Sequence, residues 1–329
     1  MSPTSKSTKN LDFSRLRFGA TAWSWYAPNP NDRVNFEESV TEIRKLNFPD
    51  DLGEERYIEV LSILPTLSGN QEKSPVAATM KRIADDHNMR VIVTGFIPNM
   101  PGAASLYSLQ VVERRIAVDL VKRGIDYASN FSRNDYAILA GPIQGVHESF
   151  PENVPTSDEM MDMEKYFVDT VKEELVPYAR ERKVKLSFEP LNHDESILVL
   201  RPGKTALDII KRINDPFVGL NVDTVHYAQE AEGCFIEAIA NTLRSGKAFN
   251  LHLCEHNRKQ FGTGDIGSCT RDLIEKIISA IPSESVLYAG LENFFPGLHR
   301  PLRIWRPDTI DPKQVVRNAA NYLKEKLSD

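Results

Sequence analysis

The sequence of 329 residues predicts an α/β protein that folds as a single (β/α)8 TIM barrel. Eight short runs of apolar and β-branched residues, typical of buried strands, alternate with eight segments whose apolar residues recur at helical spacing. Such alternation indicates βαβ units and a parallel sheet. The alternative is an open doubly wound sheet, which normally has a Gly-rich turn after its first strand. Here the first strand is followed by the aromatic loop Trp23–Tyr26, so the barrel is favoured.

The predicted strands share an apolar core that is bounded by polar or turn-forming residues. In chain order the strands are Arg17–Ala22, Tyr57–Leu61, Val91–Gly95, Tyr136–Ala140, Val184–Glu189, Phe217–Asp223, Ala248–Leu253 and Val286–Glu292.

The predicted helices are marked by apolar residues at a period near 3.6 and by residues that suit helix ends. Pro75 fits a first helical turn, and Asp158 and Glu159 suit the positive end of another helix. Pro177 is expected to kink or tighten the last turns of that second helix. The segments are Phe36–Ile43, the residues from Pro75 to Ala84, Ser105–Ala128, Ser157–Glu181, Thr205–Ile213, Ile236–Leu243, Leu273–Ile281 and Asp311–Leu327.

The amino-acid composition argues for a soluble globular protein and against membrane-spanning and nucleic-acid-binding classes. Hydrophobic residues make up 41% and charged residues 26%, as in an ordinary soluble globule, and no apolar run reaches the roughly 20 residues that span a bilayer. The net charge of −6 argues against a nucleic-acid partner. Three cysteines without a close-spaced pair favour a reducing compartment, so we expect a cytoplasmic protein with no membrane partner.

The chain is expected to form one domain. No linker or shift in composition divides residues 15–329, which are assigned to the barrel, whereas residues 1–14 are expected to be a disordered tail. The start of this tail is rich in Ser, Thr and Lys and has no apolar signal-peptide core. An organelle address in this segment is the alternative.

Chemistry-bearing residues recur at the ends of the last four predicted strands. Because the carboxyl ends of all barrel strands open on one face, three carboxylates and one imidazole should converge there. Like charges disfavour one another's ionisation, and a divalent metal ion would offset that repulsion. Oxygen ligands with one histidine suit Mn²⁺, with Mg²⁺, Co²⁺ or Zn²⁺ as alternatives. The four residues are Glu189, Asp223, His252 and Glu292.

Each of these residues also has a structural interpretation. A single acid at a strand end commonly caps a helix, and a single histidine in an apolar strand is commonly a hydrogen-bonded core residue. The stretch Leu220–His226, taken alone, suggests that Asp223 and His226 share the metal. Four such residues on consecutive strands are much less expected by accident than one, so the metal site and the structural interpretation both stay open at this point.

Three segments carry a resemblance to a known family: Phe188–Asn192, Val222–His226 and Leu251–Lys259 with Gly262–Gly264. They resemble the ketose 3-epimerases, which include the D-tagatose and D-psicose 3-epimerases and belong to the xylose isomerase-like barrel superfamily. The segments Tyr57–Val60 and Leu302–Arg306 are also similar to family segments. The resemblance covers nearly the whole chain after the tail, and its most specific part runs from His252 to Gly264.

The resemblance implies a metal-dependent epimerase that inverts C3 of a free ketose through a metal-stabilised cis-enediolate. It implies that the four strand-end residues hold one metal ion, commonly Mn²⁺ or Co²⁺, and that Glu189 and Glu292 act as acid and base. Glu195, His226 and Arg258 would contact the substrate, so the resemblance moves His226 out of the metal site. Trp25 could form a wall of the sugar pocket or pack in the core.

Because the sequence departs from the family pattern at several positions, the identity of the sugar substrate is not predicted. His193 stands where the family often has arginine, Thr21 where several members have a larger residue, and the loop Gly141–His147 lacks aromatic residues of some members. Gly262–Gly264 could cradle a phosphate or form a plain turn. The expected partners are a small-molecule sugar and, by analogy with the family, further copies of the chain in a dimer or tetramer.

Three other functions remain as alternatives. A different enzyme of the same superfamily, such as an inosose isomerase or dehydratase, would use similar keto–enol chemistry. An endonuclease IV-like nucleic-acid enzyme would need more histidines for three zinc ions and a basic surface, which this acidic chain does not suggest. A non-catalytic metal- or sugar-binding barrel is disfavoured because all four candidate ligands are present.

Overall fold

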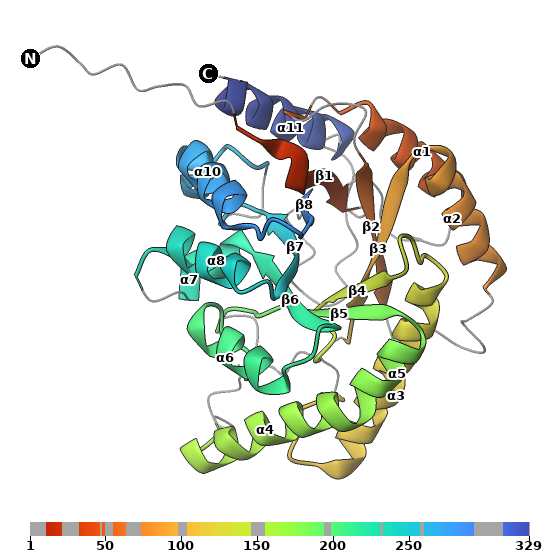
Figure 1. Cartoon of the computed structure of the whole chain (residues 1–329), viewed down its shortest axis with the longest axis vertical. Helices are drawn as coiled ribbons and strands as arrows, with labels where there is room; N and C mark the ends of the chain where they lie inside the picture. The colour runs from red at the N-terminus through yellow and green to blue at the C-terminus, as the bar shows by residue number, and fades with distance from the viewer. Residues whose placement is uncertain are drawn as a thin grey trace, which may run out of the picture.

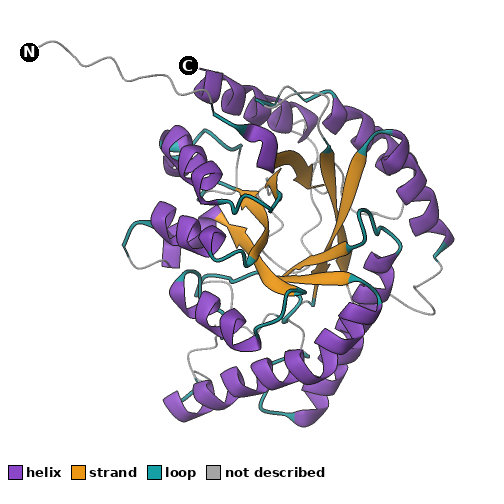
Figure 2. Cartoon of the chain, viewed as in Figure 1, coloured by secondary structure: helices purple, strands orange, loops and turns teal. Residues whose placement is uncertain are grey.

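Our computed structural model of the chain describes residues 11–21, 33–46, 48–49, 55–63, 74–97, 104–145, 155–193, 199–230, 233–256, 260–292 and 312–328. Within these ranges, eight parallel strands pair in chain order and close into a barrel, with β1 hydrogen-bonded to β8. Helices form the outer ring around the strands (Figures 1 and 2). This arrangement confirms the predicted (β/α)8 TIM barrel.

The strands agree with the predicted segments to within a few residues at each end. The acids Glu189 and Glu292, predicted as strand ends, lie one residue beyond their strands. The strands are β1 (Leu16–Thr21), β2 (Arg56–Ile63), β3 (Met89–Phe96), β4 (Ala137–Gly141), β5 (Val184–Phe188), β6 (Val218–Asp223), β7 (Ala248–Leu253) and β8 (Leu287–Leu291).

Most helices also match the predicted segments, and two short helices, α7 and α9, were not predicted. A 3-10 turn, η1 (Phe13–Arg15), precedes β1. The others are α1 (Arg33–Arg44), α2 (Pro75–Asp86), α3 (Val111–Ser129), α4 (Ser157–Thr170), the π-helical turn η5 (Val171–Leu175), α5 (Val176–Glu181), α6 (Lys204–Ile213), α7 (Thr224–Glu230), α8 (Phe235–Arg244), α9 (Asp265–Ser268), α10 (Thr270–Ala280) and α11 (Pro312–Ser328).

One predicted helix start is wrong, and so is the tightening that was one of two distortions predicted at Pro177. Helix α3 begins at Val111 rather than Ser105, because the preceding turn is held against the loop after β4: Leu106 N–H donates to Gln144 O at 2.9 Å. The turn before Pro177 is wider than an α-helix, not tighter, since Val176 N–H bonds Val171 O five residues back. Pro177 has no N–H to continue the ordinary ladder, and a π turn accommodates this loss.

The first described residues lie against the barrel. Phe13, which the sequence assigned to the tail, is partly buried against the core, and its ring lies 6.1 Å from that of Phe18. The Arg15 guanidinium donates to the carbonyl oxygen of Ile281. Among the described residues, no helix is both long and apolar enough to cross a membrane.

The barrel interior below the strand ends is filled by one aromatic and aliphatic cluster. Tyr57, Ile92, Ile138, Ala140 and Tyr288 point inward, and the rings of the two tyrosines meet edge-to-face at 5.6 Å. Two glycines of β1 and β8 make room for Tyr57. A Cβ added at Gly290 would overlap the Tyr57 hydroxyl oxygen, and one at Gly19 would overlap the Tyr57 backbone and ring. The interior is therefore a packed core that supports the residues above it.

Substitution G290A should destabilise the protein by about 1–3 kcal/mol, because an extra methyl in a packed core forces its neighbours to shift. The matched background is Y57F, since the Tyr57 hydroxyl has no hydrogen-bond partner among the described residues and is the atom that the new methyl meets. Urea unfolding of the wild type, G290A, Y57F and the double variant measures the effect as a double-mutant cycle. Equal losses from G290A in both backgrounds would contradict the described packing.

Candidate metal and catalytic site

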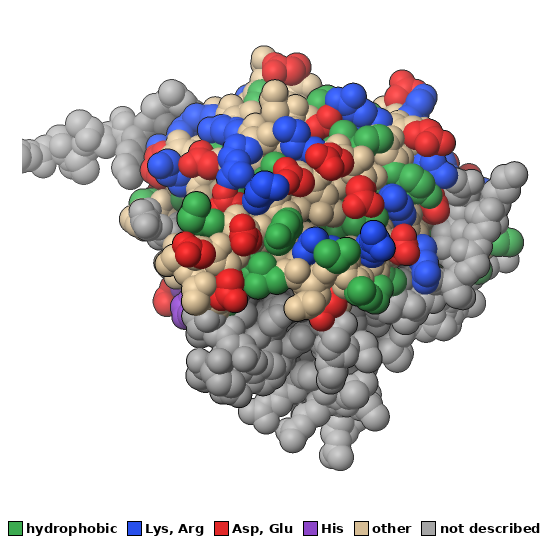
Figure 3. Space-filling model, turned by 90° about the horizontal axis from the view of Figure 1, so that it is seen from below, with side chains coloured by type: hydrophobic (Ala, Val, Ile, Leu, Met, Phe, Trp, Pro, Cys, Tyr) green, Lys and Arg blue, Asp and Glu red, His purple; other side chains and the backbone are tan. Residues whose placement is uncertain are grey.

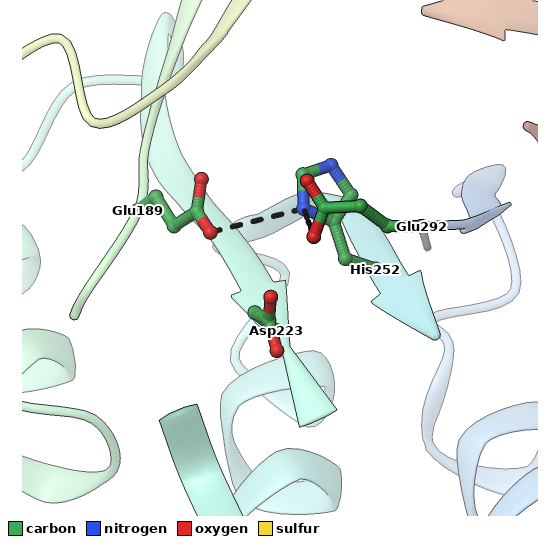
Figure 4. Close-up of side chains that lie close together, drawn as sticks. All are labelled: Glu189, Asp223, His252 and Glu292. Carbon is green, nitrogen blue, oxygen red and sulfur yellow. Dashed lines mark ion pairs between the residues drawn. The ribbon is translucent and has the colours of Figure 1, made fainter. Parts of the chain in front are cut away.

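The four predicted ligand residues meet at the carboxyl ends of β5 to β8. Glu189 follows β5, Asp223 ends β6, His252 lies in β7 and Glu292 follows β8. One potential ligand atom from each residue lies within 4.8 Å of all the others. Backbone bonds hold the two glutamates at these positions: Glu189 N–H donates to Gly141 O at 3.1 Å and Glu292 N–H to Leu253 O at 3.2 Å. Figure 4 shows Glu189 and Glu292 on opposite sides of the group, with Asp223 below them.

The donor set fits one divalent ion. Ligand atoms at roughly 2.0–2.2 Å from a metal lie no more than about 4.4 Å apart, so a small contraction of the observed spacing would suffice. All four side chains are buried, with at most 5% of Glu189 exposed. Buried carboxylates require compensation by hydrogen bonds, cations or protons. The cluster therefore suits a hard, oxygen-binding ion with one imidazole ligand.

The pKa values of His252, Glu292 and Glu189 are shifted by burial and by one another's charges. Burial alone would lower the pKa of His252, but the carboxylates of Glu292 and Glu59 outweigh it and raise this pKa well above its usual value. Burial raises the pKa of Glu292. His252 acts to lower this pKa, whereas the nearby Asp223 carboxylate raises it further. For Glu189, hydrogen bonds from His226 and His252 overcome the effect of burial and lower the pKa to about 2.

His226 lies beside the cluster, in the first turn of α7. Its Nε2 is 3.5 Å from Glu189 Oε1 and 3.9 Å from Asp223 Oδ2. Its Nδ1 accepts the backbone N–H of Asn192 at 3.3 Å, so the proton of the neutral ring is on Nε2 and points toward the site. This geometry suits a hydrogen-bond donor next to the candidate metal ligands better than a ligand.

Asp223 has a second role that the sequence suggested only as the structural interpretation. Its Oδ1 accepts the backbone N–H groups of Val225 at 2.7 Å and His226 at 3.4 Å. These contacts are those of an N-cap, and they explain why α7 begins immediately after β6. The same carboxylate thus holds the backbone of the turn that carries His226 and belongs to the candidate metal cluster.

Three buried residues that contact the ligands were not predicted as site residues. Asn221 Nδ2 donates to Glu189 Oε2 at 3.0 Å, and the Cys254 thiol donates to Glu292 Oε2 at 3.1 Å. Glu59 of β2 lies 2.9 Å from His252 Nε2. The sequence offered two signals for Glu59: it is an acid within an otherwise apolar strand, and it lies in Tyr57–Val60, a segment similar to the family.

The loop after β7 is organised by a buried carboxylate rather than by an external anion. Glu255 accepts the backbone N–H groups of Gly262 at 2.9 Å, Gly267 at 2.7 Å and Ile266 at 3.2 Å. These amides surround Glu255 as they would surround a phosphate oxygen. The Gly262–Gly264 segment is therefore a turn that is held by the protein's own carboxylate.

Three predicted substrate contacts, Glu195, Arg258 and Trp25, lie outside the described residues. Their roles stay predictions. His193, which replaces the family's arginine, is exposed, and its backbone N–H donates to Glu230 Oε1 at 2.8 Å.

Comparison with known proteins identifies the family to which the barrel belongs. The sequence profile of the xylose isomerase-like TIM barrel family matches residues 56–277. The ketose 3-epimerase of Arthrobacter globiformis is 25% identical over 215 residues, which cover 64% of this chain and 68% of that protein.

Solved structures with the same fold include an L-ribulose 3-epimerase, with a TM-score of 0.72 and 19% identity over 95% of both chains. A D-allulose 3-epimerase from Methylomonas sp., in complex with D-allulose, has a TM-score of 0.70 and 17% identity, covering 95% of this chain and 97% of that one. At such low identity these structures establish a shared fold.

Binding of Mn²⁺ at pH 7 should release protons. The raised pKa of His252 favours the protonated ring when no ion is bound, and its two nitrogens face the carboxylates of Glu59 and Glu292. The ring must lose a proton to become a ligand. Affinity should accordingly rise with pH up to the pKa of His252. Calorimetric titration at one pH in two buffers of different ionisation enthalpy measures the released protons. Identical heats in both buffers and an affinity independent of pH would contradict this assignment.

Proposed function

The chain belongs to the xylose isomerase-like TIM barrel family, and on this premise we propose that it is a metal-dependent sugar epimerase that inverts C3 of a free ketose. The observation that carries the proposal is the set of four ligand atoms within 4.8 Å at the mouth of the barrel. The proposed holders of one divalent ion, with Mn²⁺ preferred over Co²⁺ or Mg²⁺, are Glu189, Asp223, His252 and Glu292.

Epimerisation at C3 requires a proton to leave the carbon next to the ketose carbonyl and to return on the other face. When bound, the divalent ion supplies Lewis acidity that makes this proton easier to remove. Glu189 and Glu292 approach from opposite sides of the cluster (Figure 4). We assign one carboxylate to proton removal and the other to proton return, which inverts the centre.

The remaining site residues bind and orient the sugar. The Nε2–H of His226 points toward Glu189, where it can donate to a substrate oxygen as negative charge develops. Glu195, Arg258 and Trp25 are assigned to the substrate on the basis of the family resemblance. The names of the relatives favour a ketose of the D-allulose or L-ribulose type.

Two enzyme alternatives can be weighed against this proposal. An inosose isomerase or dehydratase would use the same cluster, so only substrate assays separate it from a ketose epimerase. A nucleic-acid enzyme would need a basic surface, and on the described part of the face in Figure 3 lysines and arginines are interspersed with acids. The net charge of −6 also disfavours that alternative.

The setting of the enzyme is also a proposal. We place it in the cytoplasm, because the three cysteines are free thiols in the described structure. A homo-oligomer is proposed from the family resemblance, with no nucleic-acid or membrane partner.

Incubation with Mn²⁺ in D₂O should interconvert D-fructose and D-psicose, or D-tagatose and its C3 epimer, and should place deuterium at C3 of the product. Mass spectrometry and NMR of the sugars measure both effects. Activity on an inosose, with no conversion of any of these ketoses, would contradict the proposal.

Variants E189Q and E292Q test the two proton-transfer roles. Each should slow epimerisation by about 10²–10⁴-fold, because a positioned acid or base contributes that much to a proton transfer. The matched control is E230Q, since Glu230 contacts His193 outside the cluster of ligand atoms. Full activity in both E189Q and E292Q, after correction for metal content, would remove the mechanism.

A further inference from the structure

Glu59 is a fully buried acid in β2 with two specific contacts. Its Oε2 lies 2.9 Å from His252 Nε2, and its Oε1 accepts the hydroxyl of Thr94 in β3. A carboxylate with no exposed surface is costly to bury unless its oxygens are paired. Both oxygens of Glu59 are paired, so the position of this side chain is determined by the protein around it.

The contact between Glu59 and His252 crosses the barrel interior. Strand β2 does not pair with β7, because β1 and β8 lie between them. In register, His252 is level with Gly290 of β8, Gly19 of β1 and Tyr57 of β2. Glu59 lies two residues beyond Tyr57 and is level with Thr21 of β1, so its side chain reaches His252 across the barrel and not through a paired neighbour.

The two nitrogens of the His252 ring face different groups. Nδ1 lies 3.2 Å from Glu292 Oε2 and 3.8 Å from Glu189 Oε1, on the side of the proposed metal ligands. Nε2 lies on the other side, against Glu59. A neutral imidazole carries one proton, so only one of these nitrogens can offer a lone pair to an ion.

We propose that Glu59 is the positioning residue of the metal centre: it accepts the Nε2–H of His252, holds the ring in place and leaves the Nδ1 lone pair for the ion. The inference deepens the proposed function and rests on its metal site. Thr94 contributes by fixing the other carboxylate oxygen. Carboxylates in this position orient the imidazole and increase its basicity toward a metal.

The test is Mn²⁺ affinity measured by isothermal titration calorimetry on the purified full chain. Variant E59L keeps approximate side-chain size but removes the acceptor, and it should weaken Mn²⁺ binding by about 10–100-fold. Variant E59Q keeps a neutral acceptor for Nε2–H, so its affinity should lie between those of E59L and the wild type. Equal affinity in E59L and the wild type would overturn the proposal.

Variant E55Q is the matched control. Glu55 directly precedes β2 and binds Arg133 at 3.1 Å and the Tyr288 hydroxyl at 3.0 Å, away from the ligand cluster. Its substitution should lower the melting temperature without changing Mn²⁺ affinity. Weakened Mn²⁺ binding by E55Q equal to that of E59L would mean that general destabilisation, not positioning, explains the effect, and would overturn the proposal.

A spectroscopic readout on the wild type does not depend on a variant folding. In protein labelled with ¹⁵N-histidine and loaded with diamagnetic Zn²⁺, the His252 ring should carry its proton on Nε2, with Nδ1 metal-bound. The signal is assigned by its absence in H252Q. A proton on Nδ1, or metal on Nε2, would overturn the proposal.

Failure of this inference and failure of the proposed function give different results. If the wild type binds no Mn²⁺ at Glu189, Asp223, His252 and Glu292, both proposals are contradicted. If the wild type binds one ion and E59L binds it equally well, the metal site stands and only the role of Glu59 is lost.

Discussion

The structure depends on how it compensates acids that are buried together at one end of the barrel. Four carboxyl groups, those of Glu59, Glu189, Asp223 and Glu292, share two imidazoles in a region where at most 5% of any of these acids is exposed. Like charges in such surroundings raise one another's cost of ionisation. The balance differs between the two glutamates. The imidazoles dominate at Glu189 and lower its pKa, whereas burial dominates at Glu292 and raises its pKa. A divalent cation at the centre is the simplest compensation for this excess of negative charge.

The barrel makes this concentration of charge possible by dividing its interior into two levels. Below the site, Tyr57 and Tyr288 fill the lumen with apolar and aromatic surface, and glycines in β1 and β8 leave space for them. Above that level, side chains from strands far apart in the chain meet one another. Asp223 connects the strand to the site. It is the last residue of β6, and its carboxylate caps α7 by accepting the backbone N–H groups of Val225 and His226.

Much of the fold followed from the sequence, because apolar periodicity is a local property and the alternation of strands and helices determines the class of sheet. The four strand-end residues followed for the same reason, since every barrel strand points its carboxyl end to one face. Glu59 did not, because its contact with His252 depends on the register of four strands. Helix α7 was missed because capping was considered only as an alternative to metal binding at Asp223, whereas one carboxylate can serve both roles. The role of Glu255 depends on amides that come together only in the folded loop.

The most direct test of the central claim is the position of the metal, measured by anomalous diffraction from crystals soaked with Mn²⁺. The account predicts one strong peak per chain, at roughly 2.0–2.3 Å from an oxygen of Glu189, Asp223 and Glu292 and from His252 Nδ1. His226 Nε2 should lie farther away, within reach of the sugar. A peak bound by His226, a peak remote from these residues, or no peak at saturating Mn²⁺ would contradict the claim.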